Sequence, residues 1–405
     1  MKYLFELIVG SCLLALVFSN STVKETKFIC PRPDEIYPCT CSSFPREIVR
    51  CNDVKNLEIV QSVLEHRFNN PLPTLLISNM QTFQIPQHAF ENVLATKIIV
   101  NGSNIRRIHD DAFLGQDALG ILILSDDRTL DSLNLAGNFI YNLNGTLTHL
   151  NNLEYLWLGN NRLQDIKGEL KGLARLKHLS LDGNSIFSIE GVFDDLLSLT
   201  YLNLAYNNLE EIENDLRHLK KLTYLNVSYN YITELENDFF ESLNELDTLD
   251  LSGNYLKNIC NLLSPLKYMK VLSLSNCNLK SIDDDCFKGM RHLQSLDLSG
   301  NELKNIDALT SHPFPNLLTL KLQSNRLEMF KHDLKNVRNL VELDISYNNF
   351  TTIRRRDFAH NMQLKELKIA GNSWHCSSHL FNILRRLQTK MVQIFNAPLC
   401  YQTQR

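Results

Sequence analysis

The residues with the clearest chemistry in this chain are its ten cysteines. Six of them form two groups, one near each end of the sequence: Cys30, Cys39, Cys41 and Cys51, then Cys376 and Cys400. Thiols that meet in an oxidising compartment form disulfides, which cross-link small folded regions. We therefore expect both ends to be cross-linked, and the four N-terminal cysteines allow several pairings.

Side chains that could support catalysis or hold a cofactor form no recognisable motif. The sequence has no glycine-rich phosphate loop, no Gly-x-Ser-x-Gly turn and no His-Glu-x-x-His helix. Its 12 histidines are scattered singly, which disfavours a metal site. The acidic run at residues 283–285 lacks the oxygen spacing of a calcium loop, so we interpret it as a solvated turn. We expect no enzyme activity, no catalytic residue, no cofactor and no metal.

The elements that position the remaining side chains come from one repeated pattern, Leu-x-x-Leu-x-Leu-x-x-Asn-x-Leu. Residues 153–163 fit it at every fixed position, and the second Leu recurs at positions 156, 179, 202, 225, 249, 272, 296, 320, 343 and 367, a step of 23 or 24. Such a period is typical of leucine-rich repeats. The pattern predicts an α/β solenoid, a horseshoe in which each Leu-x-Leu forms a short strand of a parallel concave sheet with its leucines inward.

The repeat is looser before residue 122. Leu75 and Ile77, then Ile98 and Val100, occupy the strand positions, and the count predicts about 14 strand units. The step from residue 122 to residue 133 is only half a period. It is either a truncated repeat or a phase break between two sub-arrays.

Three further cysteines lie inside the repeats. Cys277 occupies the Asn position of its repeat, and we interpret it as a buried, inert thiol. Cys260 and Cys286 lie on the return segments of adjacent repeats, and a disulfide between them stays open. If the first 19 residues, which include Cys12, are removed as a signal peptide, nine cysteines remain. This odd number would allow a homo- or heterodimer through an unpaired cysteine.

The outward strand positions are free to bind a ligand. Neighbouring repeats place there a ligand face of mostly aromatic residues: Tyr155, Trp157, His178, Tyr201, Asn203 and Tyr224. Amphipathic aromatic side chains are enriched at binding hot spots, although they also pack well on any pleated surface. Later strands carry Asp247, Asp250, Asp297 and Asp344, which would either select a basic partner or form a solvated face.

N-glycosylation sequons begin at four positions: Asn101, Asn144, Asn226 and Asn349. Asn226 belongs to a concave strand beside Tyr224. A glycan there would cover part of the ligand face and shift contacts toward Tyr155 and Trp157.

The first 19 residues resemble a signal peptide, with Lys2 before an apolar run that ends at Phe18. No later stretch reaches transmembrane length, and the polar C-terminus gives no lipid-anchor signal. The net charge of −4 gives no reason to expect nucleic acid or an anionic membrane as the main partner. We expect a secreted, extracellular protein.

Both ends resemble the cysteine-rich caps of extracellular leucine-rich-repeat proteins. The resemblance implies disulfides Cys30–Cys41 and Cys39–Cys51, an N-terminal cap at residues 20–70, an array at 71–372 and a C-terminal cap at 373–405. After Trp374 the commoner Cys-x-Cys is missing, which leaves the single bridge Cys376–Cys400. This two-cysteine form is similar to that of insect leucine-rich immune proteins, whose C-terminal coiled coil is absent here.

The leading hypothesis is a secreted protein that binds a protein or glycoprotein through its concave face, in innate immunity. One alternative is a cell-surface or matrix adhesion component, and another is a non-catalytic carrier subunit of a secreted enzyme. The fold cannot choose among them, because function depends on the site.

Overall fold

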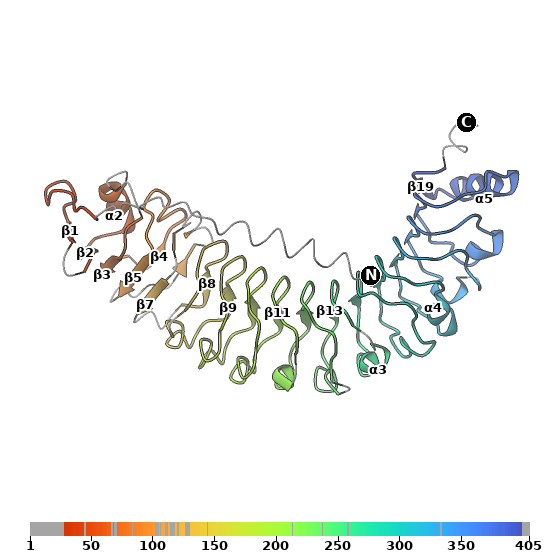
Figure 1. Cartoon of the computed structure of the whole chain (residues 1–405), viewed down its shortest axis with the longest axis horizontal. Coiled ribbons are helices and arrows are strands. Elements are labelled where there is room, and N and C mark those ends of the chain that lie inside the picture. The colour runs from red at the N-terminus through yellow and green to blue at the C-terminus, as the bar shows by residue number, and fades with distance from the viewer. Residues whose placement is uncertain are drawn as a thin grey trace, which may run out of the picture.

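The computed structural model describes residues 28–398, apart from 44–45, 66–67, 69–70, 83, 102–104, 106, 110–111, 114–117, 120, 126–129, 144, 213, 237, 257–258 and 333. The signal peptide, the Asn144 sequon and Cys400 therefore lie outside the described residues. The rest forms one curved solenoid in which the strands line the inner edge of an arc (Figure 1).

A 12-stranded parallel sheet runs through most of the arc, each strand hydrogen-bonded to its neighbours in chain order. Its strands are β8 (Ser132–Asn134), β9 (Tyr155–Trp157), β10 (His178–Ser180), β11 (Tyr201–Asn203), β12 (Tyr224–Asn226), β13 (Thr248–Asp250), β14 (Val271–Ser273), β15 (Ser295–Asp297), β16 (Thr319–Lys321), β17 (Glu342–Asp344), β18 (Glu366–Lys368) and β19 (Gln393–Phe395).

A separate five-stranded sheet forms the N-terminal end. It contains β1 (Cys39–Ser42), β2 (Ile48–Asn52), β3 (Leu75–Ser78), β5 (Lys97–Asn101) and β7 (Ile121–Ser125), and a small third sheet pairs β4 (Gln84–Ile85) with β6 (Arg107–Ile108). Strand β1 is antiparallel to β2 and covers that edge.

Short helices lie among the connecting segments, and α3 and α4 lie on the outer side of the arc (Figure 1). The helices are α2 (Leu57–Leu64), α3 (Cys260–Leu263), α4 (Asp307–Ser311) and α5 (Ser378–Thr389), with 3₁₀ turns η1 (Asn214–Leu216), η2 (Lys335–Val337) and η3 (Arg355–Phe358). Helix α5 begins at the cap Ser377, whose hydroxyl accepts from the Leu380 N–H, and its buried side chains close the C-terminal end.

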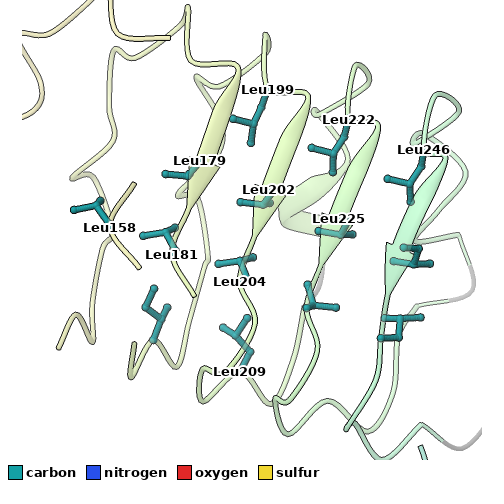
Figure 2. Close-up of a cluster of buried hydrophobic side chains, with 14 of the residues drawn as sticks. Leu158, Leu179, Leu181, Leu199, Leu202, Leu204, Leu209, Leu222, Leu225 and Leu246 are labelled. Atoms are coloured by element: carbon teal, nitrogen blue, oxygen red, sulfur yellow. The ribbon is translucent and has the colours of Figure 1, made fainter. Parts of the chain in front are cut away.

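The leucines of the repeat stack in register and face inward. Leu179 pairs with Leu202 and Leu202 with Leu225 across neighbouring strands, and all three are fully buried. Figure 2 shows this column beside a second one that includes Leu181 and Leu204. Burying one such side chain contributes about 1.5–3 kcal/mol to the free energy of folding. Each repeat adds one layer of buried leucines to the stack, so the predicted horseshoe is confirmed.

The Asn of each repeat satisfies backbone groups that the turn leaves unpaired, as the sequence predicts. The Asn207 side chain donates to the Leu181 and Leu204 carbonyls, each at 3.0 Å, and its Oδ1 accepts from the Ile186 N–H at 3.0 Å. Cys277 takes this place in its own repeat and donates to the Leu251 carbonyl at 3.3 Å. One buried polar side chain thus ties two neighbouring turns of the solenoid together.

The short step from Leu122 to Leu133 is a break between two sheets. Leu122 pairs with Ile98 in the N-terminal sheet, whereas Leu133 pairs with Leu156 in the long sheet. The hydrophobic core continues through the break, since both leucines belong to the same buried cluster. Of the two interpretations left open by the sequence, the phase break between sub-arrays is the observed one.

Three disulfides join described cysteines. They are Cys30–Cys41, Cys39–Cys51 and Cys260–Cys286. The first two are the pairs that the resemblance to cysteine-rich caps implies, and the third links α3 to the return segment of the next repeat. Cys376 is also disulfide-bonded.

Cys277 is the free cysteine among the described residues. It is fully buried, and burial raises the pKa of its thiol to about 12. A thiol that is buried and protonated at neutral pH cannot reach another chain. The expected dimer through an unpaired cysteine therefore finds no support at this position.

Candidate binding face

Five aromatic side chains meet on the outward face of strands β9–β12, and we call them the aromatic patch: Tyr155, Trp157, His178, Tyr201 and Tyr224. Strand register places Tyr155, His178, Tyr201 and Tyr224 in one row, because each stands just before the second Leu of its repeat. Trp157 follows that Leu on β9 and lies opposite Ser180.

The rings of the aromatic patch form an unbroken series of contacts. His178, Tyr201 and Tyr224 stack on one another, whereas Tyr155 and Trp157 lie tilted against His178, at 35° and 46°. Ring centroids lie 4.0 Å apart between His178 and Tyr201 and 4.2 Å apart between Tyr201 and Tyr224, with interplanar angles of 10° and 8°. Trp157 lies 5.1 Å from His178 and 6.0 Å from Tyr155. The spacing of parallel strands, about 4.8 Å, matches the distance at which flat rings stack. The sheet thus holds the rings in place.

The aromatic patch is uncharged at neutral pH. Burial lowers the pKa of His178, so its imidazole is neutral there. Burial, with the charge and hydrogen bond of neighbouring Tyr224, raises the pKa of Tyr201 well above its usual value. Tyr155 is 41% exposed and the other four are half-buried against one another. The result is an apolar surface with hydroxyl, indole and imidazole groups available for hydrogen bonding.

Asn203 joins the ligand face in position but has a structural task. Its Oδ1 accepts from the Ala205 N–H at 3.1 Å, and Asn226 accepts from the Ser228 N–H at 2.9 Å in the next strand. Asp250 and Asp344 do the same in later repeats. Asn and Asp are therefore favoured here because they close the turn that ends each strand. The recurrence of these two types after the second Leu was the signal in the sequence.

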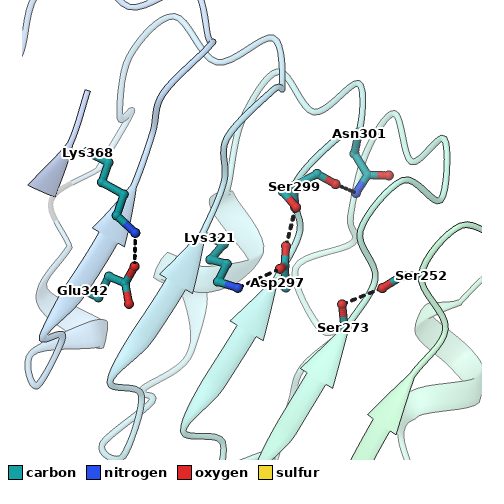
Figure 3. A network of polar contacts seen from close by, with 8 residues as sticks. All are labelled: Ser252, Ser273, Asp297, Ser299, Asn301, Lys321, Glu342 and Lys368. Carbon is teal, nitrogen blue, oxygen red and sulfur yellow. Dashed lines mark hydrogen bonds and ion pairs between the residues drawn. The ribbon is translucent and has the colours of Figure 1, made fainter. Parts of the chain in front are cut away.

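The outward face of β13–β18, which we call the polar face, carries hydrogen-bonded and ion-paired side chains (Figure 3). Lys321 lies 3.4 Å from Asp297, and Lys368 lies 2.5 Å from Glu342, a hydrogen bond that raises the pKa of Lys368. Beside this face, just before β13 and β14, Lys270 pairs with Asp247 at 2.8 Å. The acidic character expected for these strands is partly neutralised, because neighbouring lysines take up the carboxylates.

Tyrosines beside the turn Asn have backbone roles. Tyr206 and Tyr229 have left-handed φ values of 54° and 52°, and their rings stack at 4.5 Å. The Tyr229 ring also covers Gly253, whose added Cβ would meet Tyr229 Cδ1 at 2.6 Å. Gly253 is thus required both by its own φ of 68° and by that ring.

Three sequon residues can be placed. Asn101 ends β5 and is half-buried, Asn226 lies on the concave strand β12, and Asn349 is exposed after a turn Asn. Glycosylation of each stays a prediction.

Asp285, the last residue of the acidic run at 283–285, takes part in ion pairs. Hydrogen bonds from His312, at 2.8 Å, and from Lys288, at 3.1 Å, lower the pKa of Asp285. In the part of the chain that the structure covers, no three His, Cys, Asp or Glu side chains lie close enough together to hold a metal ion. No helix within that part has the length and hydrophobicity to span a membrane.

Most of the chain matches models of leucine-rich-repeat families. Residues 128–186, 190–232, 222–267 and 267–327 match the family described as Leucine rich repeat, residues 339–361 match Leucine Rich Repeat, and residues 47–134 match the BspA type Leucine rich repeat region (6 copies). The chain is a leucine-rich-repeat protein with a disulfide-linked N-terminal end. No curated protein matches the sequence.

Solved structures share the fold at low sequence identity. An internalin, InlF of Listeria monocytogenes, is 19% identical with a TM-score of 0.56, over 84% of this chain and 81% of its own. The TLR13–ssRNA13 complex is 22% identical with a TM-score of 0.58, over 85% of this chain and 56% of the matched chain. The Toll–Spatzle complex of Drosophila is 21% identical with a TM-score of 0.53, over 87% of this chain and 53% of the matched chain. The chain spans about half the length of these last two.

Proposed function

We propose that this protein is an extracellular, non-catalytic binding protein that recognises a protein or glycoprotein partner through the concave face of β9–β12. The observation that carries the proposal is the aromatic patch, in which five rings on four adjacent strands form one uncharged surface. These side chains are not part of the hydrophobic core, which the inward leucines fill.

The physical case rests on area and entropy. Aromatic side chains bury a large area and lose little rotational freedom on binding, since they have only two side-chain torsions. Stacking already restricts the rings here, so less entropy is lost when a partner binds. The Glu154–Lys177 pair, at 2.7 Å, lies beside the patch and supplies a polar rim.

Relatives support a macromolecular partner. One similar structure is a complex of Toll with Spatzle, described as a hub in development and innate immunity, and another contains TLR13 with a single-stranded RNA. RNA binding requires a basic groove, whereas the aromatic patch is neutral, which favours a protein or glycoprotein. The narrower form of the proposal is a partner in innate immunity.

Extracellular location is part of the proposal and rests on the disulfides, which persist in oxidising compartments. We place the signal peptide at residues 1–19, the N-terminal cap at 20–70, the repeat array at 71–372 and the C-terminal cap at 373–405.

The test compares two double variants of the mature chain. A partner is first captured from extracellular fluid and identified, and its affinity is then measured against the wild type, Y201A/Y224A and the control Y231A/Y255A. The control removes exposed tyrosines from two repeats at positions after the turn Asn, outside the aromatic patch. We expect Y201A/Y224A to weaken binding about 100-fold or more and the control to keep the wild-type affinity.

Equal affinity of all three proteins would overturn the assignment of the site. The identity of the captured partner decides the role: a matrix or membrane protein would indicate adhesion, and a secreted enzyme would indicate a carrier subunit. Circular dichroism and a thermal melt of each variant check that the fold is retained.

A further inference from the structure

A cavity of about 500 Å³ lies at the C-terminal end of the solenoid, between η3 and α5. Its floor is apolar, formed by the buried side chains of Phe358, Ile383 and Leu387. Helix α5 supplies most of the lining residues and lies at the C-terminal end of the arc (Figure 1). A volume in this range suits a small molecule.

One face of α5 lines this cavity. The lining residues His379, Asn382, Ile383, Arg386 and Leu387 follow the three- and four-residue spacing that brings side chains to the same side of a helix. The next residue of the series, Lys390, lies just after the helix. Its Nζ contacts the Met362 sulfur at 3.6 Å. The helix thus sets polar and basic groups above an apolar floor.

The rim of the cavity is cationic. Arg355 from η3 joins Arg386 and Lys390 there, and none of the described residues that line the cavity is acidic. All three are exposed and form no ion pair with any residue that the structure describes. Unpaired guanidinium groups are suited to bidentate contacts with phosphate or carboxylate.

The surrounding sequence has the same sign. Residues 351–398 contain eight Lys and Arg against two Asp and Glu, a net charge of +6, whereas the whole chain has −4. A second cavity, of about 560 Å³, shows the opposite character. Its acidic lining residues are Glu190, Glu210, Glu211 and Asp215. An anion is therefore attracted to one end of the molecule.

We propose that the cavity between η3 and α5 binds a small anionic amphiphile, a single hydrocarbon chain with a phosphate headgroup. The chain lies against Phe358, Ile383 and Leu387, and the phosphate pairs with Arg355, Arg386 and Lys390. This site is separate from the aromatic patch, so it stands or falls independently of the partner that binds the concave face.

The test uses decyl phosphate as the probe and the mature chain as the receptor, with binding measured by calorimetry below the critical micelle concentration. R355A/R386A removes the two guanidinium groups at the rim. The matched control R356A/R385A removes two exposed arginines from the same elements that do not line the cavity, so the net charge of both variants is equal. We expect R355A/R386A to weaken binding about tenfold or more and the control to change it less than about twofold.

Two further ligands and one further variant separate the contributions of head and chain. Inorganic phosphate and decanol are each expected to bind at least about tenfold more weakly than decyl phosphate, because each lacks one half of the recognition. Ala359→Phe, which places a ring in the cavity without a change of charge, is expected to weaken decyl phosphate.

Equal losses in the two arginine pairs would mean a diffuse basic surface and would overturn the proposal. So would inorganic phosphate that binds as tightly as decyl phosphate, or the absence of saturable binding in the wild type.

Discussion

Strands β9–β12 and strands β13–β18 are built on the same inward leucines, yet their outward side chains differ in kind. The first four strands carry the stacked, uncharged rings of the aromatic patch. The later strands carry the polar face, where Lys321 pairs with Asp297 and Lys368 with Glu342. The repeat therefore fixes the scaffold and leaves the outward positions free to differ.

The difference teaches how such a surface acquires a binding site. On the polar face charged groups satisfy one another, so a partner would have to break ion pairs before it gained contacts. On the aromatic patch only ring surface and hydrogen-bonding tips must be desolvated. We therefore place the partner on β9–β12 and give the polar face a solvated role.

The largest effect should come from the core, and it should be the same in both stretches. Leu202 and Leu320 are fully buried at the same position of their repeats, one behind each surface. Leu202→Ala and Leu320→Ala should each lower the unfolding free energy by about 3–5 kcal/mol, measured by urea unfolding. A loss in only one of them would mean that the two stretches do not share one cooperative core.

A smaller effect should follow loss of the turn Asn. Asn207→Ala leaves the carbonyls of Leu181 and Leu204 and the N–H of Ile186 without their buried partner. We expect a loss of about 2–3 kcal/mol and faster hydrogen exchange at Ile186. Asn301, which makes equivalent contacts behind the polar face, should give a matching loss as Asn301→Ala; a much smaller one would separate the two stretches.

Most of this fold could be predicted from the sequence because the period fixes each leucine by position. The strands, their register and the turn Asn all follow from a step of 23 or 24 residues. The phase break at residues 122–133 could not be decided, since a half-period step fits either a short repeat or a new sheet. Only hydrogen bonding of Leu122 and Leu133 to different sheets distinguishes the two.

The candidate sites were predictable to different degrees. The row of the aromatic patch follows directly from position in the repeat, whereas the turn-closing task of Asn203 depends on a contact with Ala205. The Lys368–Glu342 pair crosses diagonally between columns, so rotamers decide it. The cavity at the C-terminal end depends on how η3 packs against α5, which no repeat describes.

The pH dependence of the aromatic patch sharpens the contrast with the charged strands. Burial lowers the pKa of His178 below its usual value of about 6.5, so the unfolded chain takes up that proton first as the pH falls. The contribution of His178 to stability is therefore intact above pH 6.5 and declines as the pH falls toward the folded pKa. A ¹H–¹³C NMR titration should give a midpoint below 6.5. A midpoint above it would make the patch cationic in mild acid.

The smallest effect should come from the polar face. The side chains of Lys368 and Glu342 are 37% and 25% exposed, so solvent screens their attraction. A double-mutant cycle with Lys368→Met and Glu342→Gln should give a coupling energy of about 0–1 kcal/mol. This coupling energy should shrink further in 0.5 M salt, because the Debye length there is only about 4 Å and salt screens the two charges from each other. A large, salt-resistant coupling would show a rigid charged surface instead. A rigid, desolvated pair of that kind could discriminate between partners, and the polar face would then compete with the aromatic patch as the binding site.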